Sequence, residues 1–431
     1  MKHFRQFIFR DYVFDHNQKQ LRLTYGLDDA ITFTETYTFN FEFIAKIDTE
    51  LLDRACQSLF FMAGVSYYKS YLPAEIVLEK GSMDQFEADF FNKTYQKGLG
   101  EFFYLNGLSP NTKVNFQPNA LHLPEISTTN DHSGLLVGLG GGKDSLVSVE
   151  LLRSQPKVAT WSVGHRPQLE PLVEEINLPH FWVEREWDRA LLKHREQGAM
   201  NGHVPISAIF ACVGSVVAVL SGYRDVVVSN ESSASEPTLH HQGIPVNHQH
   251  SKSLEFEQNF QAYVTRGLGG AIRYYSLLRP LSELRIAELF SELGFSKYRR
   301  VFSSCNKAFL HTSNTMSWCG VCPKCAFMFL MFTPFVPRDQ LEGLFGGKNL
   351  LLDPELRQTY QQLLGIAGDR PFECVGEVKE SRMAMRLAQD LYPELANYHF
   401  DIPSNYDFRA LSPHSMPDEI FTILQSCLRR G

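Results

Sequence analysis

Residues 134–145, GLLVGLGGGKDS, join a short apolar run to a glycine-rich turn and to the start of a helix that opens LVS. The apolar run predicts a buried strand. Glycine lets the backbone turn sharply and brings N–H groups close to an anion, and the N-terminus of the following helix adds partial positive charge. This order predicts a nucleotide phosphate site formed by Gly140, Gly141, Gly142, Lys143 and Ser145.

Asp144 is unusual in a loop that attracts anions, and its expected role is to contact a metal ion or to order the loop. A Walker A loop is excluded because Asp144 occupies its Ser/Thr position and Val137 its first glycine position. The dinucleotide pattern fails because its third glycine falls on Lys143. The segment instead resembles the S-G-G-x-D-S loop of PP-loop ATP pyrophosphatases, with Gly140 in place of the first Ser. That resemblance implies ATP and Mg²⁺ as cofactors, with cleavage to AMP and pyrophosphate.

Apolar runs at residues 157–163, 180–184 and 225–229, with a buried helix at 205–220, predict an α/β fold. The expected architecture is a PP-loop (adenine nucleotide alpha hydrolase-like) parallel sheet with helices on both faces, preceded by an α+β domain. Ligands bind at the carboxyl ends of such strands. Ser162 lies at the end of one of them, Glu231 follows another, and Arg279 lies in an R-P-L segment resembling one in the same superfamily. We expect all three to contact the nucleotide or its metal ion.

Three domains are expected from the changes of pattern along the chain. Residues 1–130 contain an alternating strand at 31–43 and an amphipathic helix at 48–65, and they form the α+β domain, with a possible role in binding the substrate. Residues 131–345 form the PP-loop domain with its cysteine cluster. Residues 346–431 are mainly helical and are expected to complete the site.

Four of the eight cysteines are clustered, with Cys305 followed by Cys319, Cys322 and Cys325. Four thiolates at this spacing fit one tetrahedral Zn²⁺ of structural type. Catalytic thiols or free cysteines are the alternatives. A similar arrangement occurs in the PP-loop enzymes that make 7-cyano-7-deazaguanine.

The overall charge gives little support for nucleic-acid binding. The formal net charge is −7, whereas proteins that grip nucleic-acid phosphates usually carry a basic excess. Neither a signal peptide nor a run of about 20 apolar residues is visible, so we expect a cytoplasmic protein without membrane segments. A small-molecule substrate is favoured. The oligomeric state is not predicted.

Five segments occur in one order: SNESSAS from Ser229, VNHQHSKSLEFE from Val246, YSLLRPL from Tyr275, the cysteine cluster, and PFECVGE from Pro371. This series resembles the MurL-type UDP-N-acetylmuramoyl-L-alanyl-L-glutamate epimerases over nearly the whole chain. The resemblance implies inversion of the terminal L-Glu of UDP-MurNAc-L-Ala-L-Glu to D-Glu, through an adenylated carboxylate, for peptidoglycan synthesis. The partner is therefore the UDP-muramoyl dipeptide.

Adenylation would remove the carboxylate charge that otherwise opposes loss of the α-proton. A base can then remove that proton, and an acid can return one to the opposite face. Cys374 and His248 are the candidate acid/base residues, with Lys143 and Asp144 serving the activation step. His250 is an alternative to His248, and Cys374 could instead be a core cysteine. His203, His240 and His241 are expected at the surface.

Three other functional classes remain open from the sequence. A nucleobase-modifying or thiolating PP-loop enzyme would share the loop and the cysteines. An amide ligase would share the adenylate but pass it to an amine. A non-catalytic nucleotide-binding module would share the loop alone, although Lys143 and Asp144 would then be superfluous.

Overall fold

The computed structural model describes residues 3–126, 132–309 and 316–429. Within them, nine strands form one sheet in the order β11-β8-β5-β6-β7-β3-β2-β1-β4, and β9 and β10 form a small hairpin. The strands are β1 (Gln6–Asp15), β2 (Gln20–Leu27), β3 (Ile31–Asn40), β4 (Glu75–Leu78), β5 (Leu135–Gly138), β6 (Val158–Val163), β7 (His180–Glu186), β8 (Asp225–Val228), β9 (Leu239–His241), β10 (Ile244–Val246) and β11 (Arg273–Ser276).

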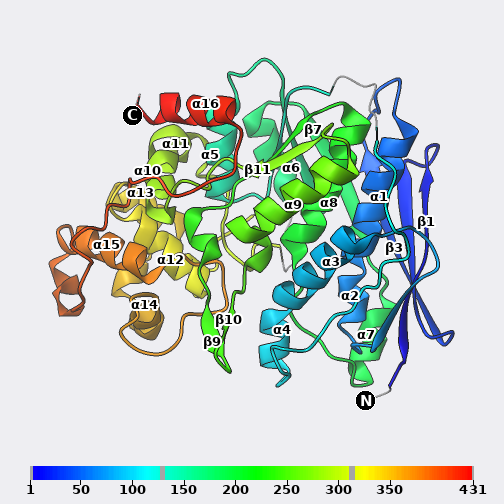
Figure 1. The fold of residues 1–431 in the computed structure, drawn as a ribbon. Coiled ribbons are helices and arrows are strands. Elements are labelled where there is room, and N and C mark those ends of the chain that lie inside the picture. The colour runs from blue at the N-terminus through cyan, green and yellow to red at the C-terminus, as the bar shows by residue number, and fades with distance from the viewer. Residues whose placement is uncertain (1–2, 127–131, 310–315, 430–431) are drawn as a thin grey trace.

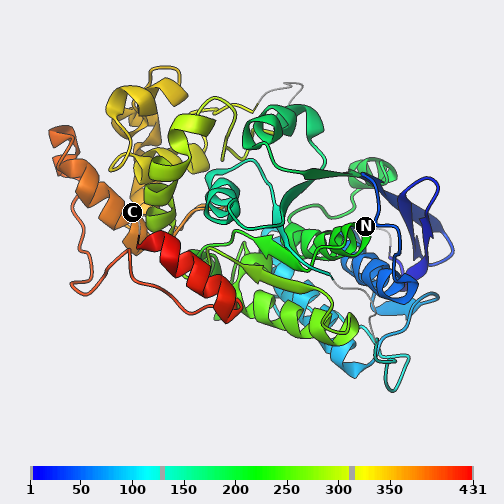
Figure 2. The same ribbon diagram turned by 90° about the horizontal axis from the view of Figure 1, so that it is seen from above.

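The helices lie on the two sides of this sheet and at one end of the molecule (Figures 1 and 2). They are α1 (Thr49–Ala63), α2 (Val65–Tyr68), α3 (Gln85–Gly98), α4 (Gly100–Leu105), α5 (Lys143–Leu152), α6 (Arg166–Ile176), α7 (Ala190–Glu196), α8 (Ile206–Ser221), α9 (Leu254–Gly267), α10 (Glu283–Leu293), α11 (Phe295–Tyr298), α12 (Pro323–Phe332), α13 (Arg338–Leu344), α14 (Arg357–Leu363), α15 (Val378–Gln389) and α16 (Asp418–Leu428). Short 3₁₀ turns are η1 (Ser232–Ser235), η2 (His250–Lys252), η3 (Leu350–Leu352), η4 (Pro354–Leu356) and η5 (Pro393–Asn397).

The parallel half of the sheet confirms the predicted α/β class. β11, β8, β5, β6 and β7 pair in parallel, and each lies within about two residues of the range expected where one was predicted. Successive residues of β5 face opposite sides: Leu136 packs in a core with α1, α8 and α9, whereas Leu135 and Val137 pack in a second core with α5, α10 and α12. Both faces are thus covered, as buried parallel strands require.

Residues 3–126 add the antiparallel half of the same sheet. β3 pairs with β7, so the sheet continues from the N-terminal strands into the parallel strands. β3 ends at Asn40 rather than at residue 43. In α1, the N-cap Asp48 accepts hydrogen bonds from the N–H groups of Glu50 and Leu51, and the buried face of the helix packs on α8. The proposed boundary at residue 130 falls outside the described residues, and the three-domain division stays a prediction.

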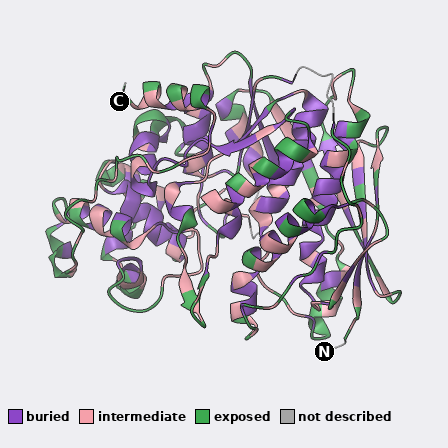
Figure 3. Ribbon diagram, viewed as in Figure 1, coloured by how far each residue is buried: buried purple, intermediate pink, exposed green. Residues whose placement is uncertain are grey.

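The remaining helices form one cluster at the end of the sheet opposite β1–β3, coloured yellow to red (Figures 1 and 2). α12 is buried along its length, as its run of aromatic and aliphatic side chains predicts (Figure 3). It packs against α10, α14 and α15. No helix among the described residues is long and apolar enough to cross a bilayer.

Candidate active site

The glycine loop lies where the sequence predicted it, between β5 and α5 at the carboxyl edge of the parallel strands. Gly141 has a φ of +85°, a conformation that glycine adopts without strain. Gly142 is the N-cap of α5, and the Ser145 hydroxyl donates back to the Gly142 carbonyl at 3.0 Å. At Gly140 no atom lies within 4 Å of where a Cβ would stand, so the missing PP-loop Ser is not excluded by space.

Two adjoining cavities open on this loop. The first, of about 330 Å³, is lined mainly by apolar and aromatic side chains, among them Trp161, Val163, Phe210, Tyr274 and Phe309. Ser162 also lines it, with its hydroxyl 2.9 Å from His180 Nε2. The second, of about 380 Å³, is polar. Both are bounded by Gly138, Gly140, Ser229, Asn230 and Phe309, so they form one continuous site.

The polar cavity brings together segments that are far apart in the sequence. It is lined by Gly142, Asp144 and Ser145 of the loop, by Lys252, by Ser303, Ser304 and Asn306, and by Lys324 and Cys374. The segment from Ser303 is fixed to the loop, because its N–H donates to the Gly141 carbonyl at 3.1 Å and the Ser304 hydroxyl accepts from Lys143 N at 3.3 Å.

Lys143 supports the loop from behind. Its ammonium is fully buried and pairs with the carboxylates of Asp144 and Glu283, and it lines neither cavity. Burial lowers the pKa of this amine, but the two carboxylates outweigh that effect and raise it above its ordinary value. The cations that do line the polar cavity are Lys252 and Lys324, and Lys324 was not singled out from the sequence.

Arg279 and Glu231 lie behind the cavity wall. The Arg279 guanidinium is buried and donates to the Glu257 carboxylate at 3.0 Å and to the backbone carbonyls of Glu231 and Lys252. Glu231 is buried as well, and burial together with Glu283 raises its pKa. Neither side chain lines the two cavities, whereas the neighbouring Asn230 lines both.

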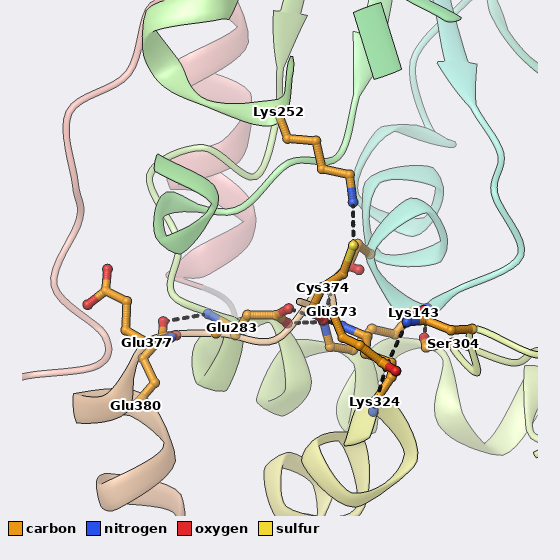
Figure 4. A network of polar contacts seen from close by, with 12 residues as sticks. Lys143, Lys252, Glu283, Ser304, Lys324, Glu373, Cys374, Glu377 and Glu380 are labelled. Atoms are coloured by element: carbon orange, nitrogen blue, oxygen red, sulfur yellow. Dashed lines mark hydrogen bonds and ion pairs between the residues drawn. The ribbon is translucent and has the colours of Figure 1, made fainter. Parts of the chain in front are cut away.

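Cys374 stands at the centre of a charged network (Figure 4). Lys252 points at it from above, with Nζ 3.4 Å from Sγ, and Lys324 donates to its backbone carbonyl from below. Lys324 Nζ also lies 3.6 Å from Glu283, which joins this network to Lys143. The Cys374 side chain is hydrogen-bonded to His248 as well.

These neighbours set the charge of Cys374 and His248. Burial raises the pKa of the Cys374 thiol, but Lys252 and the hydrogen bond with His248 outweigh it and bring the pKa down to about 7. Burial lowers the pKa of His248, but hydrogen bonds with Cys374 and Glu101 raise it to about 9. At neutral pH the pair therefore approaches a thiolate beside an imidazolium.

The structure changes the expected positions of two histidines. His203 is only partly exposed: its side chain is 21% exposed, and Nδ1 lies 3.5 Å from Glu101. His250 is buried with Nδ1 4.0 Å from Glu255, and burial lowers its pKa to about 4. His240 is exposed, as expected. Glu101 was missed, since an isolated Glu in an aromatic helix carries no sequence signal.

The four clustered cysteines converge, as predicted. Sγ atoms of Cys305 and Cys322 are 3.9 Å apart, and those of Cys319 and Cys325 are 3.7 Å apart. Sulfur atoms about 2.3 Å from a tetrahedral Zn²⁺ are separated by roughly 3.8 Å, so the four thiols fit that ion. Cys322 is also the N-cap of α12, with its sulfur accepting from Cys325 N at 3.4 Å.

Comparison with known proteins gives one family. Residues 1–277 match the model of the MurL N-terminal domain, and residues 301–396 match that of the MurL C-terminal domain. A Xanthomonas oryzae protein named UDP-N-acetyl-alpha-D-muramoyl-L-alanyl-L-glutamate epimerase is 40% identical over 340 residues, 78% of this chain and 74% of that protein. A Salinispora tropica protein of the same name is 37% identical over 388 residues, 88% of this chain and 84% of that one. No solved structure matches significantly. The chain belongs to the MurL family.

Proposed function

We propose that this protein is an isomerase that inverts the terminal L-Glu of UDP-MurNAc-L-Ala-L-Glu to D-Glu, after adenylating a carboxylate of that residue with ATP. The names of the relatives support the epimerisation and its place in peptidoglycan precursor synthesis. The observation that carries the mechanism is that Cys374 and the glycine loop line the same cavity. Activation and proton exchange can therefore occur on one bound residue.

The site fits ATP by its chemistry. The apolar cavity suits a base, and the glycine loop with the N-terminus of α5 suits phosphates. Asp144 and Asn230 offer oxygen ligands to Mg²⁺ at the polar cavity. ATP supplies an adenylyl group, which neutralises the substrate carboxylate and releases pyrophosphate.

The proton exchange is assigned to Cys374 and His248. The thiolate takes the α-proton, and the electron pair moves onto the activated carbonyl oxygen, where Lys252 and Lys324 offer stabilising charge. The imidazolium returns a proton to the opposite face, and water then releases AMP and D-Glu. Inversion requires the two groups to face the α-carbon from opposite sides, so substrate binding would replace their mutual hydrogen bond.

The UDP-muramoyl portion needs a large site near this centre. A cavity of about 1110 Å³ lies between α3, β10 and α9, on a segment that includes Asn247 and His250 and so flanks His248. We assign the nucleotide-sugar portion of the substrate to this cavity. It would make residues of the N-terminal part of the chain substrate ligands, as expected from the sequence.

The test is to incubate the protein with Mg-ATP and UDP-MurNAc-L-Ala-L-Glu in D₂O. D-Glu, AMP and deuterium at the α-carbon should appear together, and none should appear without ATP. AMP without D-Glu would refute the epimerase and favour an amide ligase or another adenylating enzyme. D-Glu formed without ATP would refute the adenylate. Neither product from folded, metal-replete protein would refute both and favour a nucleotide-binding module.

A further inference from the structure

We propose that Glu101 of the N-terminal helix α4 is a positioning residue, which orients His248 and holds it as an imidazolium beside Cys374. The assignment rests on the proposed function for its catalytic meaning, but the electrostatic relation between the three side chains can be tested without any substrate. It gives the N-terminal part of the chain a direct effect on the acid/base pair.

The geometry joins three side chains through His248. His248 Nδ1 is in hydrogen-bond contact with Glu101 Oε2, and the imidazole lies near enough to the Cys374 thiol for each group to shift the pKa of the other. A carboxylate only accepts, so Nδ1 carries the hydrogen and Nε2 is left to face the thiol. The contact is well covered, with the Glu101 side chain 9% and the His248 side chain 15% exposed.

Glu101 has no competing cation of comparable strength. His203 Nδ1 is 3.5 Å from the same Oε2, but burial and the charge of His248 lower the pKa of His203 to about 4, so it is neutral near pH 7. No Lys or Arg ion pair to Glu101 is present among the described residues. The carboxylate therefore acts chiefly on His248.

Loss of the Glu101 charge should also change the pKa of the Cys374 thiol. Cys374 is faced by Lys252, Lys324 and His248, and His248 is faced by Glu101, Cys374, His203 and Glu373. Loss of the Glu101 charge lowers the pKa of His248, and a His248 that has lost its proton no longer stabilises the thiolate. Once the pKa of His248 falls to or below that of Cys374, the thiol titrates beside a neutral imidazole and its pKa rises.

A metal ion is the rival interpretation. Glu101, His203 and His248 each offer a ligand atom, and these atoms lie within 4.8 Å of one another. Because Glu101 and His248 are in direct hydrogen-bond contact, however, the atoms that a metal ion would have to separate already bind each other. The arrangement therefore favours a hydrogen-bonded pair of Glu101 and His248 that holds a proton over a metal site at these residues.

The experiment compares wild type with Glu101→Gln, which keeps the shape and removes the charge. Alkylation of Cys374 by iodoacetamide is followed against pH in the full-length, metal-replete protein, with the Cys374 peptide quantified by mass spectrometry. We expect the midpoint to rise by about one pH unit or more, equivalent to a tenfold loss of thiolate at low pH. Glu79→Gln, an exposed carboxylate elsewhere in the N-terminal part, should leave it unchanged.

The kinetic readout separates positioning from binding. In Glu101→Gln, kcat should fall by about 10²-fold while the KM values for ATP and the dipeptide substrate change less than about threefold, and Glu101→Asp should recover part of the loss. If Glu101→Gln does not fold, Glu101→Asp alone must show a smaller shift in the same direction.

Each result of these experiments either supports or overturns the proposed role of Glu101. An unshifted alkylation profile in the folded variant overturns the proposal. So does a second bound metal ion in wild type that Glu101→Gln loses. A shifted profile in a protein that makes no D-Glu sustains the role of Glu101 and refutes only the proposed function.

Discussion

At the scale of single residues, the charge of Cys374 and His248 sets an expected pH dependence. The thiolate is lost as pH falls below about 7, and the imidazolium is lost as pH rises above about 9. kcat/KM should therefore be bell-shaped, with limbs near these two values that belong to the coupled pair. The measurement is the initial rate of D-Glu formation from pH 5.5 to 10. A profile that is still rising at pH 10 contradicts an acid role for His248.

Replacing Cys374 should separate the two half-reactions. Cys374→Ser removes an easily ionised base but leaves the glycine loop intact, so incorporation of solvent deuterium at the α-carbon should fall by about 10²–10⁴-fold. ATP–pyrophosphate exchange driven by the substrate should persist. Cys427→Ser, whose sulfur lies 3.8 Å from the Leu151 carbonyl, is the matched control and should retain both activities. Equal loss of both activities in Cys374→Ser would point to a structural cysteine.

At this scale the sequence identifies side chains by their chemistry, but it does not say which residues will surround them in the fold. His248 was singled out because imidazole titrates near neutral pH, and Cys374 as a thiol that would need a shifted pKa to act as acid or base. Lys143 was expected to meet phosphate, yet its ammonium is buried between two carboxylates, one of which, Glu283, lies 140 positions away. Such pairings depend on tertiary packing, which local spacing does not encode.

At the scale of elements, the glycine loop gives a test of backbone conformation. Gly141→Ala should raise the KM for ATP about tenfold or more, because φ is +85°, where an L side chain is strained, and because the added Cβ would lie 2.7 Å from Met316 Sδ, so that this side chain or the loop must shift. Gly198→Ala is the control: φ is +93° there, with nothing within 4 Å. Both variants should lose about 1–2 kcal/mol of stability, and only the first should lose ATP affinity. A normal KM in Gly141→Ala would show that the loop does not hold the nucleotide.

The cysteine cluster should hold one Zn²⁺ that braces the same loop. It fixes Cys305, and the adjacent Ser303 and Ser304 are hydrogen-bonded to the loop. Cys319→Ser should therefore abolish stoichiometric zinc, lower Tm and raise the KM for ATP. Elemental analysis, thermal unfolding and kinetics measure these effects, with Cys427→Ser again as control. Full zinc content in Cys319→Ser would contradict a four-thiolate site.

At the scale of the whole molecule, the sequence predicted four of the five parallel strands, without β11, and did not predict the extent of the sheet. β5, β6, β7 and β8 are short apolar runs, which local pattern reveals. The pairing of Phe39 in β3 with Val183 in β7 joins segments 144 residues apart, and nothing in either segment specifies that partner. The joining of N-terminal and parallel strands therefore appears only in the three-dimensional structure.

The pairing of β3 with β7 bears on whether residues 1–130 form a separate domain. All four tryptophans, Trp161, Trp182, Trp187 and Trp318, lie after residue 130, so their fluorescence reports unfolding of the later part of the chain. Phe61 in α1 is fully buried against Phe9 and Phe91. Because β3 pairs with β7 and α1 packs on α8, we expect Phe61→Ala to lower the tryptophan-monitored free energy of unfolding by about 3–5 kcal/mol.

The control for this test is Leu105→Ala in α4, where the side chain is exposed and the tryptophan transition should not move. Tyrosine fluorescence and circular dichroism should show the same midpoint as tryptophan in each variant, since one cooperative unit has one transition. An unshifted tryptophan transition in Phe61→Ala, with an earlier transition by circular dichroism, would establish an independent N-terminal domain. In a single unit, stability in α4 and the placement of Glu101 are tied to the parallel strands that carry the glycine loop.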